Sequence, residues 1–418
     1  MSALVKTGYD RPRRDHDPLL TEVGRGTPTG ELLRRYWHPV ALAADVTVET
    51  PLRVRILGES LVAFRDGEAK VGLLYERCCH RGTSLYYGRV EERGIRCCYH
   101  GWLFARDGAC LEMPCEPAGS SRPSMVRQPW YPVREYRGLI FAYLGPYDRM
   151  PAFPIYDSIE RDAERPGQIV LASAGLGSGG HVVVPELGLR TGDPVLPANW
   201  LQIYENVMDP YHVYILHMNL SGPQFASVMA KTPQIEWGDT PLGTRAYQDR
   251  RMDAGRLFRR ITEAFVPNVR LVPTPSAGED GHGFQAGGLL SWVVPNDDTH
   301  TTFFSLGAFP LKEDGTPHRV RRSQFDGRDW EKLTEEEHRR MPGDVEAQIG
   351  QGPISIHPEE HLVLSDRGII MLRRKWRKQL QRIEAGEDPI GVVRGPDVVV
   401  VETIAGNFLH EPAEAAAE

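Results

Sequence analysis

Short runs of alternating apolar and polar residues fill the chain from about Val40 to Tyr147, and this pattern predicts β-strands. One hairpin is predicted for PLRVRILGESLVAFRDG, with strands at VRIL and LVAF and a second turn at Arg-Asp-Gly. A second hairpin is predicted for GIRCCYHGWLFARDGAC, and a further strand for GLIFAYLGP. We therefore expect a small all-β domain in this part of the chain.

The segment before these strands predicts an arm with one short helix. That helix covers GELLRRYW, whose apolar residues fall on one side, and Thr27 or Thr29 is placed to cap it. Prolines then mark a boundary near residue 150. The pattern thus divides the chain into an arm at 1–38, a β domain at 39–150 and a second domain at 151–418.

The second domain mixes helices and strands, so the fold class is α+β. A helix interrupted at Pro210 is predicted for residues 199–218, and strands for residues 235–310. Helices return at 330–385, and the last of them is amphipathic. The glycine- and proline-rich stretch 171–197 predicts a loop or hairpin insertion, and the tail HEPAEAAAE predicts a frayed end.

Composition and charge exclude several classes of protein. With 418 residues, 41% of them hydrophobic, the chain is long and apolar enough for two or three folded domains rather than a disordered chain. The 42 glycines and 33 prolines exclude a coiled coil. A net charge of −7 disfavours nucleic acid as a partner. The chain has no long apolar run and no signal-like start, so we expect a cytoplasmic protein without a membrane span.

The cysteines lie in one short stretch, which suggests a metal site rather than a disulfide framework. Two pairs of residues there follow the pattern C-x-H-(x16)-C-x2-H. Two thiolates and two imidazoles suit zinc or an iron–sulfur centre. Because each short loop offers one cysteine and one histidine, a [2Fe–2S] cluster is favoured over a zinc knuckle. The other four cysteines are expected to serve packing: Cys79, Cys98, Cys110 and Cys115.

The stretch CCHRGTSLYYGRVEERGIRCCYHGW resembles the Rieske signature, C-x-H-R-G followed by C-x-x-H-G-W. The resemblance implies that the cluster ligands are Cys78, His80, Cys97 and His100. The family commonly has proline where this chain has its two additional cysteines next to the ligands. Those extra thiols make the site more sensitive to oxidation.

A second candidate site lies in the interrupted helix, where His217 follows His212 five positions along the chain. Such a pair lies about 140° apart on an ideal α-helix, so a π-bulge or a helix end is needed to bring both to one metal. The run resembles the N-x-x-D-x-x-H-(x4)-H motif of the mononuclear iron site in Rieske oxygenases. The resemblance implies two histidine ligands and one carboxylate, and Asp344, ahead of a Q-G-P-I run, is the best candidate. Glu346 and Asp366 are the rival carboxylates.

The resemblance also implies roles for two further residues of this motif. Asp209 would link His100 of one subunit to His212 of the next, with both hydrogen bonds compensating for its burial. A helix cap before Pro210 is the alternative role for this aspartate. Asn206 would support the geometry of the iron site rather than bind the metal.

The resemblance extends over most of the chain, to the branch that contains phthalate and phenoxybenzoate dioxygenases and an O-demethylase of lignin-derived biaryl acids. It implies a Rieske β domain with a helix-grip catalytic domain, an antiparallel sheet flanked by helices. It also implies a homotrimer (α3), Fe(II) beside the [2Fe–2S] cluster, and electrons from NAD(P)H through a reductase or ferredoxin. The arm is expected to pack on the catalytic domain.

The function implied is the terminal oxygenase of a multicomponent system that oxidises an aromatic acid with O2. We favour O-demethylation or ether cleavage of a lignin-like aryl carboxylate, with ring hydroxylation of the phthalate type as the alternative. A Rieske electron carrier and a zinc-stabilised binding module are the alternatives from other classes. A carboxylate clamp is sought among Arg251, Arg256, Arg259, Arg260 and Arg270.

Overall fold

The computed structural model of the chain describes residues 14–117, 119–175, 195–221, 223–274, 285–315 and 333–412. The expectations for the start of the arm, for most of the glycine- and proline-rich stretch and for the end of the tail fall outside these ranges. No helix within the described ranges is both long and apolar enough to cross a membrane.

Three small sheets occupy the part of the chain that predicted an all-β domain. The first has the order β1 (Trp37–Leu42), β10 (Leu139–Tyr143) and β9 (Val133–Tyr136). The second joins β2 (Leu52–Ile56), β3 (Glu59–Arg65) and β4 (Val71–Tyr75). The third runs through β5 (Arg89–Glu91), β6 (Gly94–Arg96), β7 (Leu103–Phe104) and β8 (Cys110–Glu112). The predicted hairpins are therefore present, with the first turn at Leu57 and Gly58.

A large antiparallel sheet forms the second part of the molecule. Its order is β12 (Gln168–Ala174), β19 (His300–Pro310), β18 (Leu289–Asp297), β17 (Val269–Val272), β16 (Leu257–Phe265), β15 (Gly243–Arg251) and β14 (Gln234–Asp239). Two short strands add to it, β13 (Val195–Leu196) on β19 and β21 (Gly406–His410) on β16. A separate parallel pair joins β11 (Phe153–Tyr156) to β20 (Val398–Val401).

The helices are short except for the last. They are α1 (Pro18–Thr21), α2 (Pro28–Leu33), α3 (Asp157–Glu164), α4 (Trp200–Glu205), α5 (Tyr211–Tyr214), α6 (Glu335–Arg340), α7 (Asp344–Ile349) and α8 (Arg367–Glu384). The Thr27 side chain caps α2 by accepting from the Gly30 amide, and Pro28 fits the first helical position. A 3₁₀ turn at Asn206–Met208 and a π-helix at Ile215–Leu220 flank α5.

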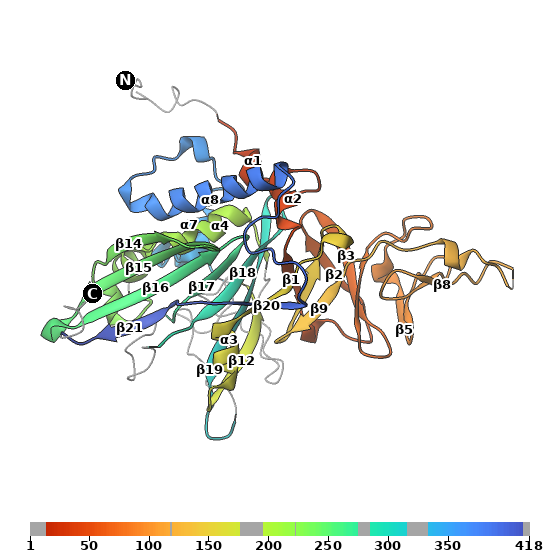
Figure 1. Cartoon of the computed structure of the whole chain (residues 1–418), viewed down its shortest axis with the longest axis horizontal. Coiled ribbons are helices and arrows are strands. Elements are labelled where there is room, and N and C mark those ends of the chain that lie inside the picture. Colours follow the sequence, from red (N-terminus) through yellow and green to blue (C-terminus); the bar gives the residue numbers. More distant parts are fainter. Residues whose placement is uncertain are drawn as a thin grey trace.

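The two faces of the large sheet have different neighbours. Helices α4, α7 and α8 cover one face, as Figure 1 shows, and the Trp376 ring of α8 lies 4.8 Å from Trp200 of α4. The opposite face meets α3 and the first small sheet, where Trp292 lies 5.2 Å from Phe141. Side chains alternate between these faces along each strand, so one set of residues points toward the helices that carry the histidines.

The α+β class and the helix-grip arrangement of the second part are confirmed. The domain limits at residues 38 and 150 remain a prediction. Several strands were not predicted, among them β11, β12, β20 and β21, and the start of the glycine- and proline-rich stretch belongs to β12 rather than to a loop. For β21, which pairs with β16, GNFLH is too short to give a periodic signal.

Candidate metal centres

Two tight turns present the first set of predicted ligands. In the first turn the Cys78 amide donates to the Thr83 carbonyl at 2.9 Å, and the Gly82 amide donates back to the Cys78 carbonyl at 2.8 Å. The second turn closes in the same way, with the Gly101 amide 3.1 Å from the Cys97 carbonyl. Both glycines have φ above +70°, a conformation that a side chain disfavours. Each turn therefore directs one cysteine and one histidine to the same end of the β domain.

The four candidate ligands of these turns differ in burial, because the cysteines lie inside the β domain and the histidines lie nearer its surface. Cys78 and Cys97 are each only 3% exposed and belong to the apolar core of the β domain. The rings of His80 and His100 lie 4.5 Å apart nearer the surface, and His80 stacks on Trp102 at 4.3 Å. Sulfur donors inside and nitrogen donors outside fit a [2Fe–2S] cluster with one iron on each side.

Gln128 is a support of the first turn that the sequence did not predict. Its buried amide nitrogen donates to the carbonyls of Tyr75 and Arg77 at 2.8 and 2.9 Å. Its oxygen accepts from the Cys79 amide at 2.8 Å. The side chain thus fixes the backbone on both sides of the ligand Cys78 and satisfies buried polar groups there.

The second set of predicted ligands converges from three elements. His212 lies on α5, His217 lies in the π-helix, and Asp344 is the first residue of α7. The Asp344 Oδ1 atom is 3.5 Å from Nε2 of His212 and 3.2 Å from Nε2 of His217. One donor atom from each residue lies within 4.8 Å of the others. The wider turn of the π-helix brings histidines five residues apart to one side, as the spacing required.

Both imidazoles of this triad are held by their other nitrogen. Nδ1 of His217 is 2.8 Å from the Gln224 Oε1 acceptor, and Nδ1 of His212 contacts the Asp209 carbonyl. Each Nδ1–H therefore has an acceptor, and each Nε2 is turned toward Asp344, where a bound metal would take the place of a proton on Nε2. The Asn206 amide donates to Asp344 Oδ1 at 3.2 Å and so also holds the carboxylate.

Electrostatics keep Asp344 ionised. Burial raises the pKa of Asp344, but the hydrogen bond and charge of His217 outweigh it and hold that pKa well below its usual range. The rival carboxylates are engaged elsewhere. Glu346 accepts from the Gly343 amide at 2.7 Å, and Asp366 accepts from the Val363 amide at 2.7 Å.

Asp209 is half-buried and directly precedes Pro210, the N-cap residue of α5. The backbone amides of His212 and Tyr211 oppose the effect of burial on its pKa, so a capping role remains the alternative to the bridge. The Oδ2 atom of Asp209 lies 3.8 Å from Nδ1 of His212. Burial raises the pKa of Asp209. A hydrogen-bonding partner on its exposed side would compensate for that burial, and the bridge to His100 of another subunit remains a prediction.

Three buried arginines lie on the sheet face that points toward α4 and α5: Arg250, Arg260 and Arg270. Two of them belong to the five predicted candidates, whereas Arg259 points to the other face and pairs with Asp249 at 2.9 Å. Arg250 was missed because it stands next to the exposed Arg251, and only the strand register separates an inward arginine from an outward one.

Of these three arginines, Arg270 is the one that interacts electrostatically with a triad residue, Asp344. Its charge contributes to the low pKa of Asp344, and burial lowers its own pKa to about 10. The guanidinium lies 4.4 Å from the centre of the Phe303 ring and 3.5 Å from the Ile203 carbonyl. Its Nε–H has no hydrogen-bond partner among the described residues.

One buried glutamine joins the histidine segment to the segment that carries Asp344. The Gln202 amide on α4 donates to the carbonyls of Gln348 and Gly352 at 2.8 and 2.9 Å. Its oxygen accepts from the Ser355 amide at 2.9 Å. These three bonds set the distance between α4 and the end of α7.

Gln202→Ala is expected to weaken iron binding at the triad by about tenfold to a hundredfold, as removal of an outer support does at other metal sites. Chelator competition on protein with its visible cluster spectrum intact measures this effect. Gln379→Ala is the matched control, since Gln379 is a buried amide on α8 that binds the Ile390 amide, away from the triad. Equal iron affinity in the two variants would contradict the expectation.

Comparison with known proteins identifies the class. Residues 36–136 match the Rieske [2Fe-2S] domain family. The chain is 46% identical to the phenoxybenzoate dioxygenase subunit alpha of Ectopseudomonas oleovorans, over 94% of this chain and 91% of that protein. It is 34% identical to the 5,5'-dehydrodivanillate O-demethylase oxygenase subunit of Sphingobium sp. (strain NBRC 103272 / SYK-6), over 92% and 84% of the two chains. The chain belongs to the Rieske non-heme iron oxygenases.

Within that family the chain is an oxygenase subunit of a multicomponent system, in the branch of these relatives. It therefore carries a Rieske cluster and a mononuclear iron and receives electrons from a partner protein. Membership of this family excludes the two alternative functions, a zinc-stabilised binding module and a Rieske electron carrier. A relative with a different kind of substrate is the tert-butanol monooxygenase / tert-amyl alcohol desaturase oxygenase subunit of Aquincola tertiaricarbonis, 37% identical over 90% of this chain and 78% of that protein.

Solved structures agree on the fold. NdmA of Pseudomonas putida CBB5 with caffeine superposes with a TM-score of 0.59 at 19% identity, covering 89% of this chain and 99% of that one. Dicamba monooxygenase bound to dicamba gives a TM-score of 0.57 at 17% identity, covering 85% and 99%.

Proposed function

We propose that this oxygenase acts on an aryl carboxylate, with Cys78, His80, Cys97 and His100 holding the [2Fe–2S] cluster and His212, His217 and Asp344 holding Fe(II). Iron bound at such a triad supplies activation of O2 beside the substrate. The chain's own part is to orient both imidazoles from Nδ1 and to keep Asp344 anionic through His217 and Arg270. Asp209 makes the electronic contact between subunits of a homotrimer.

The burial of Arg270 is the observation that supports a carboxylate as the substrate class. A buried charge is costly when no opposite charge compensates for it. Asp344 is the acidic group in its electrostatic range, and that carboxylate is already shared with two histidines. A substrate carboxylate would bind the unsatisfied side of the guanidinium and place the aromatic ring near the triad. Two of the relatives act, by their names, on a phenoxybenzoate and a dehydrodivanillate, and both compounds are aryl carboxylates.

For the reaction we favour O-demethylation or ether cleavage over ring hydroxylation, because both of those named substrates are aryl ethers. O-Demethylation consumes the ether, O2, two electrons and two protons, and it releases a phenol, formaldehyde and water. The test offers methoxybenzoates, biaryl acids and phenoxybenzoates to the iron-loaded protein with NADH and a surrogate reductase. Formaldehyde or a cleaved phenol formed with NADH consumption supports the proposal. A ring diol without either product would favour the phthalate-type alternative.

Arg270→Gln is expected to raise KM for a carboxylated substrate by about thirtyfold, equivalent to about 2 kcal/mol for a charged hydrogen bond. The methyl ester of the same substrate should bind both proteins equally, because it lacks the anion. Arg259→Gln serves as the control, since that arginine pairs with Asp249 on the other face of the sheet. A KM that rises equally for acid and ester would argue against recognition of the carboxylate.

A further inference from the structure

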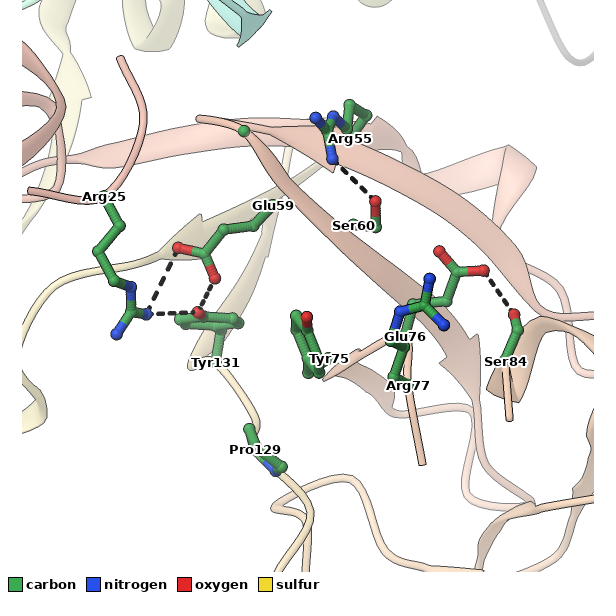
Figure 2. Close-up of a pocket in the computed structure, with 11 residues that line it drawn as sticks. Arg25, Arg55, Glu59, Ser60, Tyr75, Glu76, Arg77, Ser84, Pro129 and Tyr131 are labelled. Atoms are coloured by element: carbon green, nitrogen blue, oxygen red, sulfur yellow. Dashed lines mark hydrogen bonds and ion pairs between the residues drawn. The ribbon is translucent and has the colours of Figure 1, made fainter. Parts of the chain in front are cut away.

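A recess with a cavity volume of about 670 Å³ opens on the β domain, away from the triad. Figure 2 shows arginines from three separate segments around it, Arg25 of the arm, Arg55 of β2 and Arg77 after β4. Tyr75 and Tyr131 complete its wall. We call this site the arginine recess. The iron site proposed at His212, His217 and Asp344 makes no use of it.

The arginine recess adjoins the first ligand turn. Arg77 immediately precedes Cys78, and the Cys78 amide closes that turn by bonding to Thr83. Ser84, which follows the turn, also lines the recess. A protein that contacts the recess would therefore lie against the backbone that holds a cluster ligand. This is a short route for an electron into the cluster.

The glutamates of the recess are already neutralised within the chain. Glu59 binds Arg34 at 2.9 Å and accepts from the Tyr131 hydroxyl, and these contacts outweigh burial and lower its pKa. Glu76 accepts from Ser84 and from Arg53, the latter at 3.4 Å. The acidic groups inside the recess are thus not free to repel an incoming carboxylate.

The arginines, in contrast, keep donors for an external partner. Arg77 bonds only weakly to the Gly82 carbonyl at 3.4 Å. Arg55 bonds to the Ser60 hydroxyl, and its ion pair with Asp297 is long at 3.8 Å. One guanidinium nitrogen of Arg25 donates to Glu59 at 3.5 Å and to the Tyr131 hydroxyl at 3.3 Å. The Arg25 side chain is 70% exposed, so a partner would use its remaining donors. In a chain of net charge −7, this cluster forms a local site of positive charge.

Exposed tyrosines extend the surface beyond the recess. Arg53, which binds Glu76 at its edge, lies 3.9 Å over the Tyr86 ring and 5.3 Å from that of Tyr87. Tyr87 is 63% exposed. Arginine and tyrosine are enriched where proteins bind one another tightly, so the composition matches a docking surface.

We propose that the arginine recess and the neighbouring Tyr86 and Tyr87 form the docking surface of the electron donor, which presents surface carboxylates to Arg25, Arg55 and Arg77. The proposal rests on the assignment of the cluster to the adjoining turns. Opposite charges accelerate the encounter, and the tyrosines give it contact area. Arg77 is too near a ligand for a clean test, so the test uses the other two arginines.

The test measures reduction of the cluster in the full protein by a reduced plant-type [2Fe–2S] ferredoxin, an acidic probe of the donor class. Arg25→Glu and Arg55→Glu should each lower the second-order rate constant about tenfold and weaken its dependence on salt. Photoreduction by a deazaflavin, a small reductant that needs no docking, should be unchanged. Arg340→Glu makes the same charge change on α6 and should leave both rates unchanged, since Arg340 is also well exposed.

Unchanged ferredoxin rates in both recess variants would overturn the proposal. A slower rate accompanied by a change in oligomeric state, measured by light scattering, would also overturn it and assign the recess to a contact between copies of this chain. Failure of the cluster assignment has a different signature, because the wild-type protein would then lack the visible Rieske spectrum and no reductant would bleach it.

Discussion

His212→Ala is expected to lower turnover by about a thousandfold or more while the visible spectrum of the Rieske cluster stays unchanged. The substitution removes one of three donors from the triad, so the iron that activates O2 is lost. The cluster ligands belong to turns of a different domain and share no contact with His212. Product formation and iron content per chain, measured beside the absorption spectrum, check this result.

His300→Ala is the matched control for that variant. His300 is an exposed histidine at the start of β19, bound to Asp297 at 3.0 Å and distant from the triad in the chain. It should leave turnover, iron content and spectrum as in the wild type. Loss of the Rieske spectrum in a folded His212→Ala protein would contradict the assignment of two separate centres.

Asp209→Ala is expected to retain both metals and yet slow electron transfer from cluster to iron by about a hundredfold. The carboxylate is half-buried beside His212, and its predicted partner is His100 of another subunit. Its removal would abolish the predicted link between the two imidazoles, whereas the ligands themselves remain. Stopped-flow mixing of the reduced protein with substrate and O2 follows oxidation of the cluster in a single turnover.

Asp209→Asn separates the bridge from the packing of this residue. The amide keeps the volume of the carboxylate but has only one acceptor oxygen for two imidazole donors. We expect a rate between those of the wild type and Asp209→Ala. If cluster oxidation is as fast in both variants as in the wild type, Asp209 does not carry the contact.

The sequence allowed prediction of those parts of the site that depend on local spacing. The two cysteine–histidine pairs lie in short turns whose glycines and backbone bonds come from neighbouring residues. The separation of His212 and His217 required a distorted helix, and a π-helix is found there. Asp344 lies far along the chain, and only the resemblance to a family could select it over Glu346 and Asp366.

The supports of the site could not be predicted, because their partners are set by the tertiary fold. Gln128 and Gln202 bond to backbone groups that no spacing rule connects to them. Arg250 and Arg251 differ by one position, and only the register of β15 decides which of them is buried. The arm contributes Arg25 to the arginine recess, a contact that its helical pattern does not reveal.

The two centres lie in different parts of one chain: in Figure 1 the third small sheet forms the right-hand end of the molecule, whereas α7 lies beside the large sheet in the other half. If each iron draws its electrons from a neighbouring chain, one polypeptide is not the functional unit of this enzyme. The consequence is genetic as well as chemical. Chains that lack a working cluster and chains that lack a working triad would complement each other when they are co-expressed, although neither chain alone would have activity.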